Sequence, residues 1–138
     1  MDTMVFINLP VADLERSKTF YEALGYSINP DFTDETAACV VVSDTISVMI
    51  LTHAKFAEFT DKTIADTGTI EVINSLSAES KDAVHRVVDA AVMAGGTEDR
   101  PEMDLGFMYQ RSFLDPDGHR WEHVWMDPQA TQDGPPSA

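Results

Sequence analysis

The feature of this sequence that most constrains its fold is one order of elements that occurs twice. In each copy, a short apolar strand is followed by a capped amphipathic helix that ends at glycine, and then by three further strands. The pair Ile7-Asn8 in the first copy corresponds to the pair Ile73-Asn74 in the second, each a few residues ahead of its helix. The repeat predicts an α+β chain made of two tandem βαβββ modules.

The first predicted helix has signals at both ends. Asp13 is a suitable N-cap, Phe20 and Leu24 recur at helical spacing on one face, and Gly25 is a typical C-terminal stop. We therefore predict a helix at residues 13–24. Around it we predict strands at residues 4–8, 26–31, 36–42 and 46–51.

The second copy repeats these signals over a slightly longer helix. Ser80 is a suitable N-cap, Val84 and Val88 belong to the apolar stripe, and Gly95 follows the helix. These residues predict a helix at 80–94. The strands predicted for this copy are residues 69–76, 97–101, 107–113 and 119–126.

The two copies are predicted to form one domain, residues 1–128. The modules span about 1–52 and 69–128, and the polar segment 53–68 is the predicted linker between them. With 43% hydrophobic residues, the chain can bury a core without disulfides. The segment 129–138 is polar, rich in proline and without periodicity, so we expect a disordered tail.

The net charge of the chain limits the classes of partner that it can bind. The formal net charge is -15, so the average field repels phosphates and anionic lipids, and we expect neither nucleic acid nor a membrane as a partner. The N-terminus lacks the pattern of a signal peptide, which favours a cytoplasmic protein. Cys39 is the only cysteine and lies in an apolar run, where a buried, inert thiol is expected.

Three segments of the sequence resemble a known superfamily. They are FINLPVADLERSKTFYEALGY near the start, VMILTH in the middle and FLDPDGHRWEHVW near the end. Together they resemble the vicinal oxygen chelate superfamily of glyoxalases, bleomycin-resistance proteins and extradiol dioxygenases. The resemblance implies a curved mixed sheet with both helices on its convex face and a small-molecule pocket on its concave face. It also implies a homodimer and, in many members, a divalent metal held by one side chain from each of four strands.

The metal-ligand pattern of the glyoxalases is incomplete in this sequence. The first two ligand positions fall on Phe6 and Ile50, which offer no donor atom. The third falls near Ile73, or on Glu71 in a different registration, and the fourth falls on Glu122. We therefore expect no metal cofactor. The alternative is a divalent metal in a rearranged site that uses Glu122 and Glu71.

A ligand-binding surface can be predicted from the turn Asp115–Gly118. If this turn pairs Leu114 with His119, Arg111 comes opposite Glu122, and Tyr109 lies on the same face. An ordinary cross-strand ion pair between Arg111 and Glu122 explains the same pattern equally well. The full set of predicted ligand-binding residues is Phe6, Asn8, Ile50, Tyr109, Arg111 and Glu122. No catalytic residue can be named.

Three functions fit these observations. The first is a protein that binds a small organic ligand without a metal, like the bleomycin-resistance relatives. The second is a metal-dependent glyoxalase-like lyase or isomerase of the lactoylglutathione lyase type with rearranged ligands. The third is an interaction module without a ligand.

Overall fold

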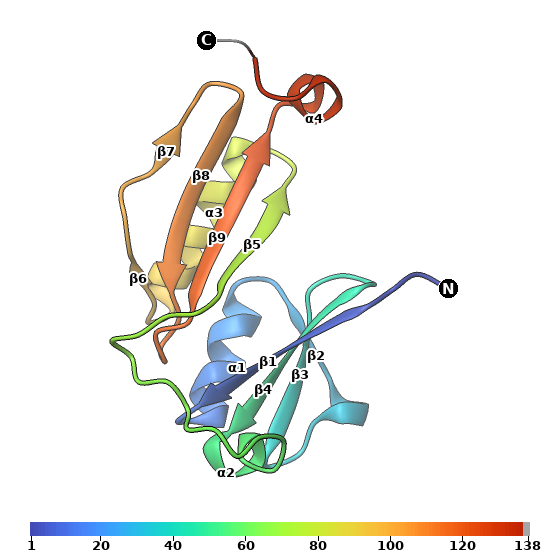
Figure 1. The fold of residues 1–138 in the computed structure, drawn as a ribbon, viewed down its shortest axis with the longest axis vertical. Coiled ribbons are helices and arrows are strands. Elements are labelled where there is room, and N and C mark those ends of the chain that lie inside the picture. Colours follow the sequence, from blue (N-terminus) through green and yellow to red (C-terminus); the bar gives the residue numbers. More distant parts are fainter. Residues whose placement is uncertain (137–138) are drawn as a thin grey trace. The chain divides into compact units, whose positions relative to one another are not determined.

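The computed structural model describes residues 1–136 and divides into two compact units, Met1–Thr69 and Ile70–Ala138 (Figure 1). Each unit begins with a strand and a helix and continues with further strands that form a mixed sheet. The α+β architecture of two βαβββ modules is therefore confirmed. The division between the units falls at the end of the predicted linker, 53–68. No helix in the described part of the chain is long and apolar enough to cross a membrane.

The first unit contains a four-stranded sheet in the order β1-β4-β3-β2. Strand β1 is parallel to β4, and the other neighbouring strands are antiparallel. A short 3-10 turn, Pro30–Phe32, follows β2. The elements of this unit are β1 (Val5–Val11), α1 (Leu14–Ala23), β2 (Ser27–Asn29), β3 (Ala37–Val41), β4 (Ile46–Thr52) and α2 (His53–Phe56).

Helix α1 forms for the reasons that the sequence indicates. The Asp13 carboxylate accepts a hydrogen bond from the backbone N–H of Arg16 at 3.0 Å, which caps the first turn. Gly25 ends the helix with a φ of 102°, a left-handed conformation that suits glycine. The rings of Phe20 and Tyr21, both 1% exposed, meet edge to face with centroids 5.1 Å apart in the core of the unit.

The second unit contains a five-stranded sheet in which β5, β9, β8 and β6 follow one another, and β7 also pairs with β8. Strand β5 is parallel to β9, and the other pairs are antiparallel. The elements of this unit are β5 (Ile73–Ala78), α3 (Lys81–Met93), β6 (Thr97–Glu98), β7 (Met103–Asp104), β8 (Met108–Leu114), β9 (Arg120–Met126) and α4 (Pro128–Asp133).

Helix α3 covers one face of this second sheet, behind β8 and β9 in the view of Figure 1. The Ser80 hydroxyl accepts a hydrogen bond from the backbone N–H of Ala83 at 3.0 Å and caps the helix. Val84, Val88 and Ala91 form its apolar stripe, and each is 0% exposed. Both predicted helices are confirmed, and the residues chosen for their buried stripes are buried.

The turn between β8 and β9 is one residue longer than predicted. The backbone N–H of Asp115 donates to the carbonyl of His119 at 2.9 Å, and the Asp115 carboxylate accepts hydrogen bonds from the N–H groups of Asp117 and His119. Leu114 is therefore paired with Arg120 instead of His119. The prediction of the register between these strands was wrong by one residue, and this changes every cross-strand partner.

Other segments also differ from their predictions. The strands predicted at 26–31 and 97–101 cover only Ser27–Asn29 and Thr97–Glu98, and strand β7 was not predicted. The strand predicted at 69–76 is formed by Ile73–Ala78. The linker 53–68 begins with helix α2. The tail, predicted to be disordered from residue 129 on, forms helix α4 over Pro128–Asp133, and its residues 137 and 138 lie outside the described part of the chain.

The buried stripe of α1 gives a test of this fold. Leu24 is 8% exposed at the end of the helix, so Leu24→Ala should lower the free energy of unfolding by about 2–5 kcal/mol through lost apolar contact and a residual cavity. Glu22→Ala, at an exposed position of the same helix, is the control and should change it by less than about 0.5 kcal/mol. Urea denaturation followed by circular dichroism measures both. Equal losses in the two variants would contradict the assignment of the stripe.

Candidate functional site

The sheet of the second unit has two chemically different faces. Arg111 on β8 is hydrogen-bonded to His85 and Asp89 on α3, so the side chains that share its face point toward the helix. We call the opposite side the open face. The register assigns to the open face the residues Ile73, Ser75, Ser77, Thr97, Met103, Met108, Gln110, Ser112, Leu114, Arg120, Glu122, Val124 and Met126.

Glu122 is the centre of a hydrogen-bonded network on the open face. Its Oε1 accepts a hydrogen bond from the Ser75 hydroxyl at 2.6 Å, and its Oε2 accepts one from Nη2 of Arg120 at 3.1 Å. Arg120 also pairs with Asp99. The side chains of Arg120 and Glu122 are 10% and 16% exposed. The guanidinium of Arg120 thus pairs with two carboxylates, so the network carries a net negative charge. The hydrogen bonds to both of its oxygens orient Glu122 as an acceptor.

Arg111 lies on the helix side and makes no pair with Glu122. Its Nε and Nη2 donate to the two carboxylate oxygens of Glu98, both at 2.9 Å. Its Nη1 donates to Asp89 at 3.0 Å and to Nδ1 of His85 at 2.9 Å. The hydrogen bond from Arg111 lowers the pKa of Glu98 and raises that of the guanidinium. Both interpretations of an Arg111–Glu122 pair were wrong, since the actual partner of Glu122 on β8 is Ser112.

Tyr109 also belongs to the helix side. It is 3% exposed, and its hydroxyl donates a hydrogen bond to Glu102. Burial and this hydrogen bond raise the pKa of Tyr109 to about 12. The ammonium of Lys81, at the start of α3, lies 5.6 Å from the centre of the Tyr109 ring and 5.5 Å from that of Trp125. These contacts attach the helix to the sheet, and the predicted place of Tyr109 on the same face as Glu122 was wrong.

The predicted residues of the first unit are divided between the two faces of its sheet. Phe6 is 53% exposed, and Asn8, on the same face of β1, donates a hydrogen bond to the Phe6 carbonyl at 3.2 Å. Ile50 is paired with Leu9, three residues from Phe6, and it is 0% exposed. Ile50 therefore lies on the opposite, buried face of this sheet and does not share a surface with Phe6. The convergence of Phe6 and Asn8 with Glu122 involves both units and stays a prediction.

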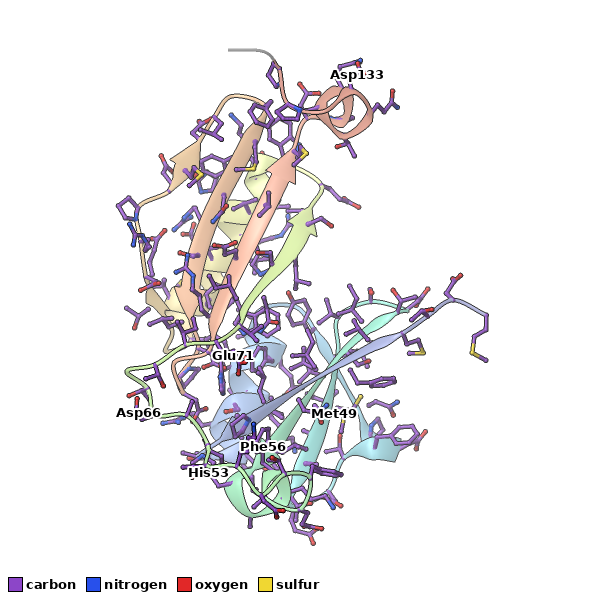
Figure 2. The ribbon with its side chains drawn as sticks, viewed as in Figure 1. Met49, His53, Phe56, Asp66, Glu71 and Asp133 are labelled. Atoms are coloured by element: carbon purple, nitrogen blue, oxygen red, sulfur yellow. The ribbon has the colours of Figure 1, made fainter. Side chains whose placement is uncertain are left out.

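The residues at the family's metal-ligand positions do not fit a divalent ion. Phe6, Ile50 and Ile73 carry no donor atoms, and Ile73 is paired with Arg120. Glu71 lies in the exposed segment before β5 (Figure 2). Glu122 already pairs with the guanidinium of Arg120, whose charge opposes the approach of a cation. Among residues 1–136, no group of three or more His, Cys, Asp and Glu side chains is placed to hold a metal.

Sequence reasoning missed two partners of Glu122. Arg120 is two residues before Glu122 on the same strand, so strand parity alone places both on one face and provides the signal. Ser75 becomes its neighbour only through the parallel pairing of β5 with β9. No local pattern in the sequence gives the register of that pair.

The comparisons with known proteins agree with this architecture. Residues 3–43 match the family model of the bleomycin resistance protein-like N-terminal region. A hypothetical protein of S. aureus, SA1046, is 26% identical with a TM-score of 0.77, and the match covers 91% of this chain and 94% of that one. No curated protein matches the sequence.

Two further solved structures carry descriptive names. A glyoxalase/bleomycin resistance protein/dioxygenase family enzyme of Burkholderia phytofirmans is 17% identical with a TM-score of 0.74, and the match covers 91% of this chain and 99% of that one. The bleomycin resistance determinant encoded on the transposon Tn5 is 18% identical with a TM-score of 0.61 and the same coverage of 91% and 99%.

The chain therefore shares the fold of structures named as glyoxalase, bleomycin resistance and dioxygenase proteins. The match of the first module to a bleomycin resistance-like family model supports the same relationship from the sequence. Both findings support the resemblance to the vicinal oxygen chelate superfamily that the sequence shows.

His123, on the helix side of β9, should make stability depend on pH. It is 3% exposed, it stacks on Phe113 with ring centroids 5.8 Å apart, and its Nε2 has no hydrogen-bond partner in the described part of the chain. Burial lowers the pKa of His123 from 6.5 to about 4. Below pH 6.5 the unfolded chain therefore binds a proton that the folded chain does not. Stability should fall as the pH drops toward 4, by about 3 kcal/mol from this residue.

The variant His123→Phe removes both the titration and the buried nitrogen without a partner. It should be more stable than the parent by about 1 kcal/mol at neutral pH, and the difference should widen as the pH falls. Urea denaturation between about pH 7.5 and about pH 4.5 measures the effect. The control for an added aromatic ring is His119→Phe, at the turn. Parallel pH profiles for the parent and His123→Phe would show that His123 is not the group responsible.

Proposed function

We propose that the chain binds a small organic ligand without a metal, and that the open face of the second sheet around Glu122 forms part of the binding surface. The observation that carries this proposal is the orientation of Glu122 by Ser75 and Arg120. A carboxylate that is held at both oxygens and still partly exposed is ready to accept a hydrogen bond from a ligand. Nothing in such a network requires a metal to position it.

The donor set supports a metal-free site. A positioned divalent ion needs several oxygen or nitrogen ligands that converge at about 2.0–2.6 Å. At the positions of the family pattern, Glu122 is the one side chain with a suitable donor, and its charge is shared with Arg120. Phe6 and Ile50 occupy two further ligand positions, and their side chains offer no donor atom.

The alternative is a metal-dependent glyoxalase-like lyase of the lactoylglutathione lyase type. The name of the Burkholderia relative, a family enzyme, favours this alternative. The name of the Tn5 relative, a bleomycin resistance determinant, favours binding. In this chain a lyase needs a metal held by Glu122 with Glu71, and Glu71 lies outside β5 in an exposed segment.

Elemental analysis and an activity assay separate the two functions. Protein produced with added nickel or zinc should contain far less than one metal ion per chain, because the donors are missing. Turnover of the hemithioacetal of methylglyoxal and glutathione should stay at background. Glu122→Gln should change neither result, and Glu79→Gln, an exposed carboxylate in the same unit, is the matched control. Close to one metal per chain with lyase activity, both lost in Glu122→Gln alone, would overturn the proposal.

We also propose a cytoplasmic homodimer, as the superfamily resemblance implies. Light scattering at micromolar concentration should give twice the mass of the 15.2 kDa chain. A monomer mass across the whole concentration range would contradict the assembly and leave the ligand-binding proposal in place.

A further inference from the structure

We infer that the open face of the second sheet binds the planar cation of an amidine or a guanidine. The residues that bind it are Gln110, Ser112 and Glu122, which we call the polar patch. The inference rests on the proposed function and adds the chemical class of the ligand. It comes from the hydrogen bonds that these three side chains make and from those that they leave unmade.

The three residues of the polar patch are neighbours on two strands. Ser112 on β8 is paired directly with Glu122 on β9. Gln110 lies two residues before Ser112 on the same face of β8, so it is a diagonal neighbour of Glu122. The Cβ atoms of side chains in such positions are about 4.5–8 Å apart, which is within reach of one small ligand group.

Ser112 has unused hydrogen-bonding capacity in a buried place. It is 3% exposed, and its hydroxyl makes no hydrogen bond within residues 1–136. Among the same residues, only Nε2 of His123 is both enclosed and without a partner, so the hydroxyl of Ser112 keeps contact with the surface. A buried serine whose hydroxyl can be reached but is not used points to a partner that is not part of the chain.

Glu122 has acceptor capacity left next to Ser112. A carboxylate offers about four lone-pair sites, and Ser75 and Arg120 use one on each oxygen. Ser75 approaches from β5, and Arg120 approaches along β9, so the side of Glu122 toward β8 carries neither partner. One site on each oxygen therefore remains for a group that donates two hydrogen bonds at once.

The charge around the polar patch favours a cation over an anion. Arg120 pairs with both Asp99 and Glu122, so these three side chains together carry one net negative charge. Because its guanidinium already has two carboxylate partners, Arg120 has little to offer an anionic ligand. Arg120 is also the one basic residue that the register assigns to the open face.

A planar group with paired N–H donors satisfies all three side chains together. An amidinium or guanidinium carries two parallel N–H groups on one edge, which match the two oxygens of a carboxylate such as that of Glu122. Its other N–H groups can donate to the amide oxygen of Gln110 and to the hydroxyl of Ser112. An ammonium group is a compact point charge and cannot form the paired contact, so it should bind less tightly.

The rows on both sides of the polar patch contain apolar side chains. The row on one side of Glu122 contains Met103 and Val124. The row on the other side contains Leu114 and Ile73. An apolar body of the ligand therefore finds contacts whichever way it extends. The polar patch selects the head group of the ligand and sets no length.

Four probes with the same ring and different head groups test this ligand class: benzamidine, benzylamine, benzamide and benzoate. Each is titrated into the intact ¹⁵N-labelled chain at about 0.15 M salt, which screens the general attraction of an acidic chain for cations. Benzamidine should bind at least about tenfold more tightly than benzamide and benzoate, and about threefold more tightly than benzylamine. Its shifts should centre on the polar patch and include the side-chain amide of Gln110.

Two pairs of variants assign the contacts. Glu122→Gln should weaken benzamidine at least about tenfold, whereas Glu79→Gln, an exposed carboxylate of the same unit, should leave its affinity unchanged. Ser112→Ala should weaken benzamidine about threefold, whereas Ser77→Ala, an exposed serine of the same face, should have no effect. Because Ser112→Ala removes a hydroxyl that has no partner in the chain, it keeps the test valid if Glu122→Gln does not fold.

The inference is overturned if any of the other three probes binds as tightly as benzamidine, or if Glu122→Gln and Glu79→Gln weaken benzamidine equally. It is also overturned if no probe shifts the signals of the polar patch. The metal analysis tests the proposed function separately, so a metal-free chain with no preference for benzamidine refutes the ligand class alone.

Discussion

The chemistry of the second unit depends on the hydrogen bonds inside one turn. The Asp115 carboxylate accepts from the backbone N–H groups of Asp117 and His119, and this fixes a turn that sets Leu114 opposite Arg120. Because side chains alternate between the faces of a sheet, a shift of one residue would exchange every cross-strand partner. The turn therefore decides that Glu122 meets Ser112 and that Arg111 meets His123.

The same turn separates two arginines that have different tasks. Arg111 has its guanidinium enclosed by Glu98, Asp89 and His85, so its charge is used to join the sheet to α3 and β6. Arg120 also pairs with two carboxylates, but one of them, Glu122, faces the open side and is held by Ser75. The network of Arg111 holds the sheet against the helix. The other presents an oriented carboxylate on the open face.

The sequence was sufficient for features that are decided locally. Helices α1 and α3 were predictable because the caps Asp13 and Ser80 and the apolar spacing lie within a few residues of one another. The place of Arg111 was not, because it follows from a turn whose length is set by the Asp115 carboxylate. The face of Ile50 could not be predicted either, since a family pattern gives a position and not the face that it occupies. Ser75 could not be found, because parallel pairing joins residues 47 positions apart.

The parallel pairing also determines when each unit can form during synthesis. In both units the first strand lies at the edge of the sheet, and its partner is the strand made after all the others of that sheet: β4 for β1, and β9 for β5. Neither sheet can therefore close until nearly all of its unit has left the ribosome, and until then the first strand has no partner in the completed sheet. Each module must be released as a whole before it is stable, and the first can close while the second is still being translated.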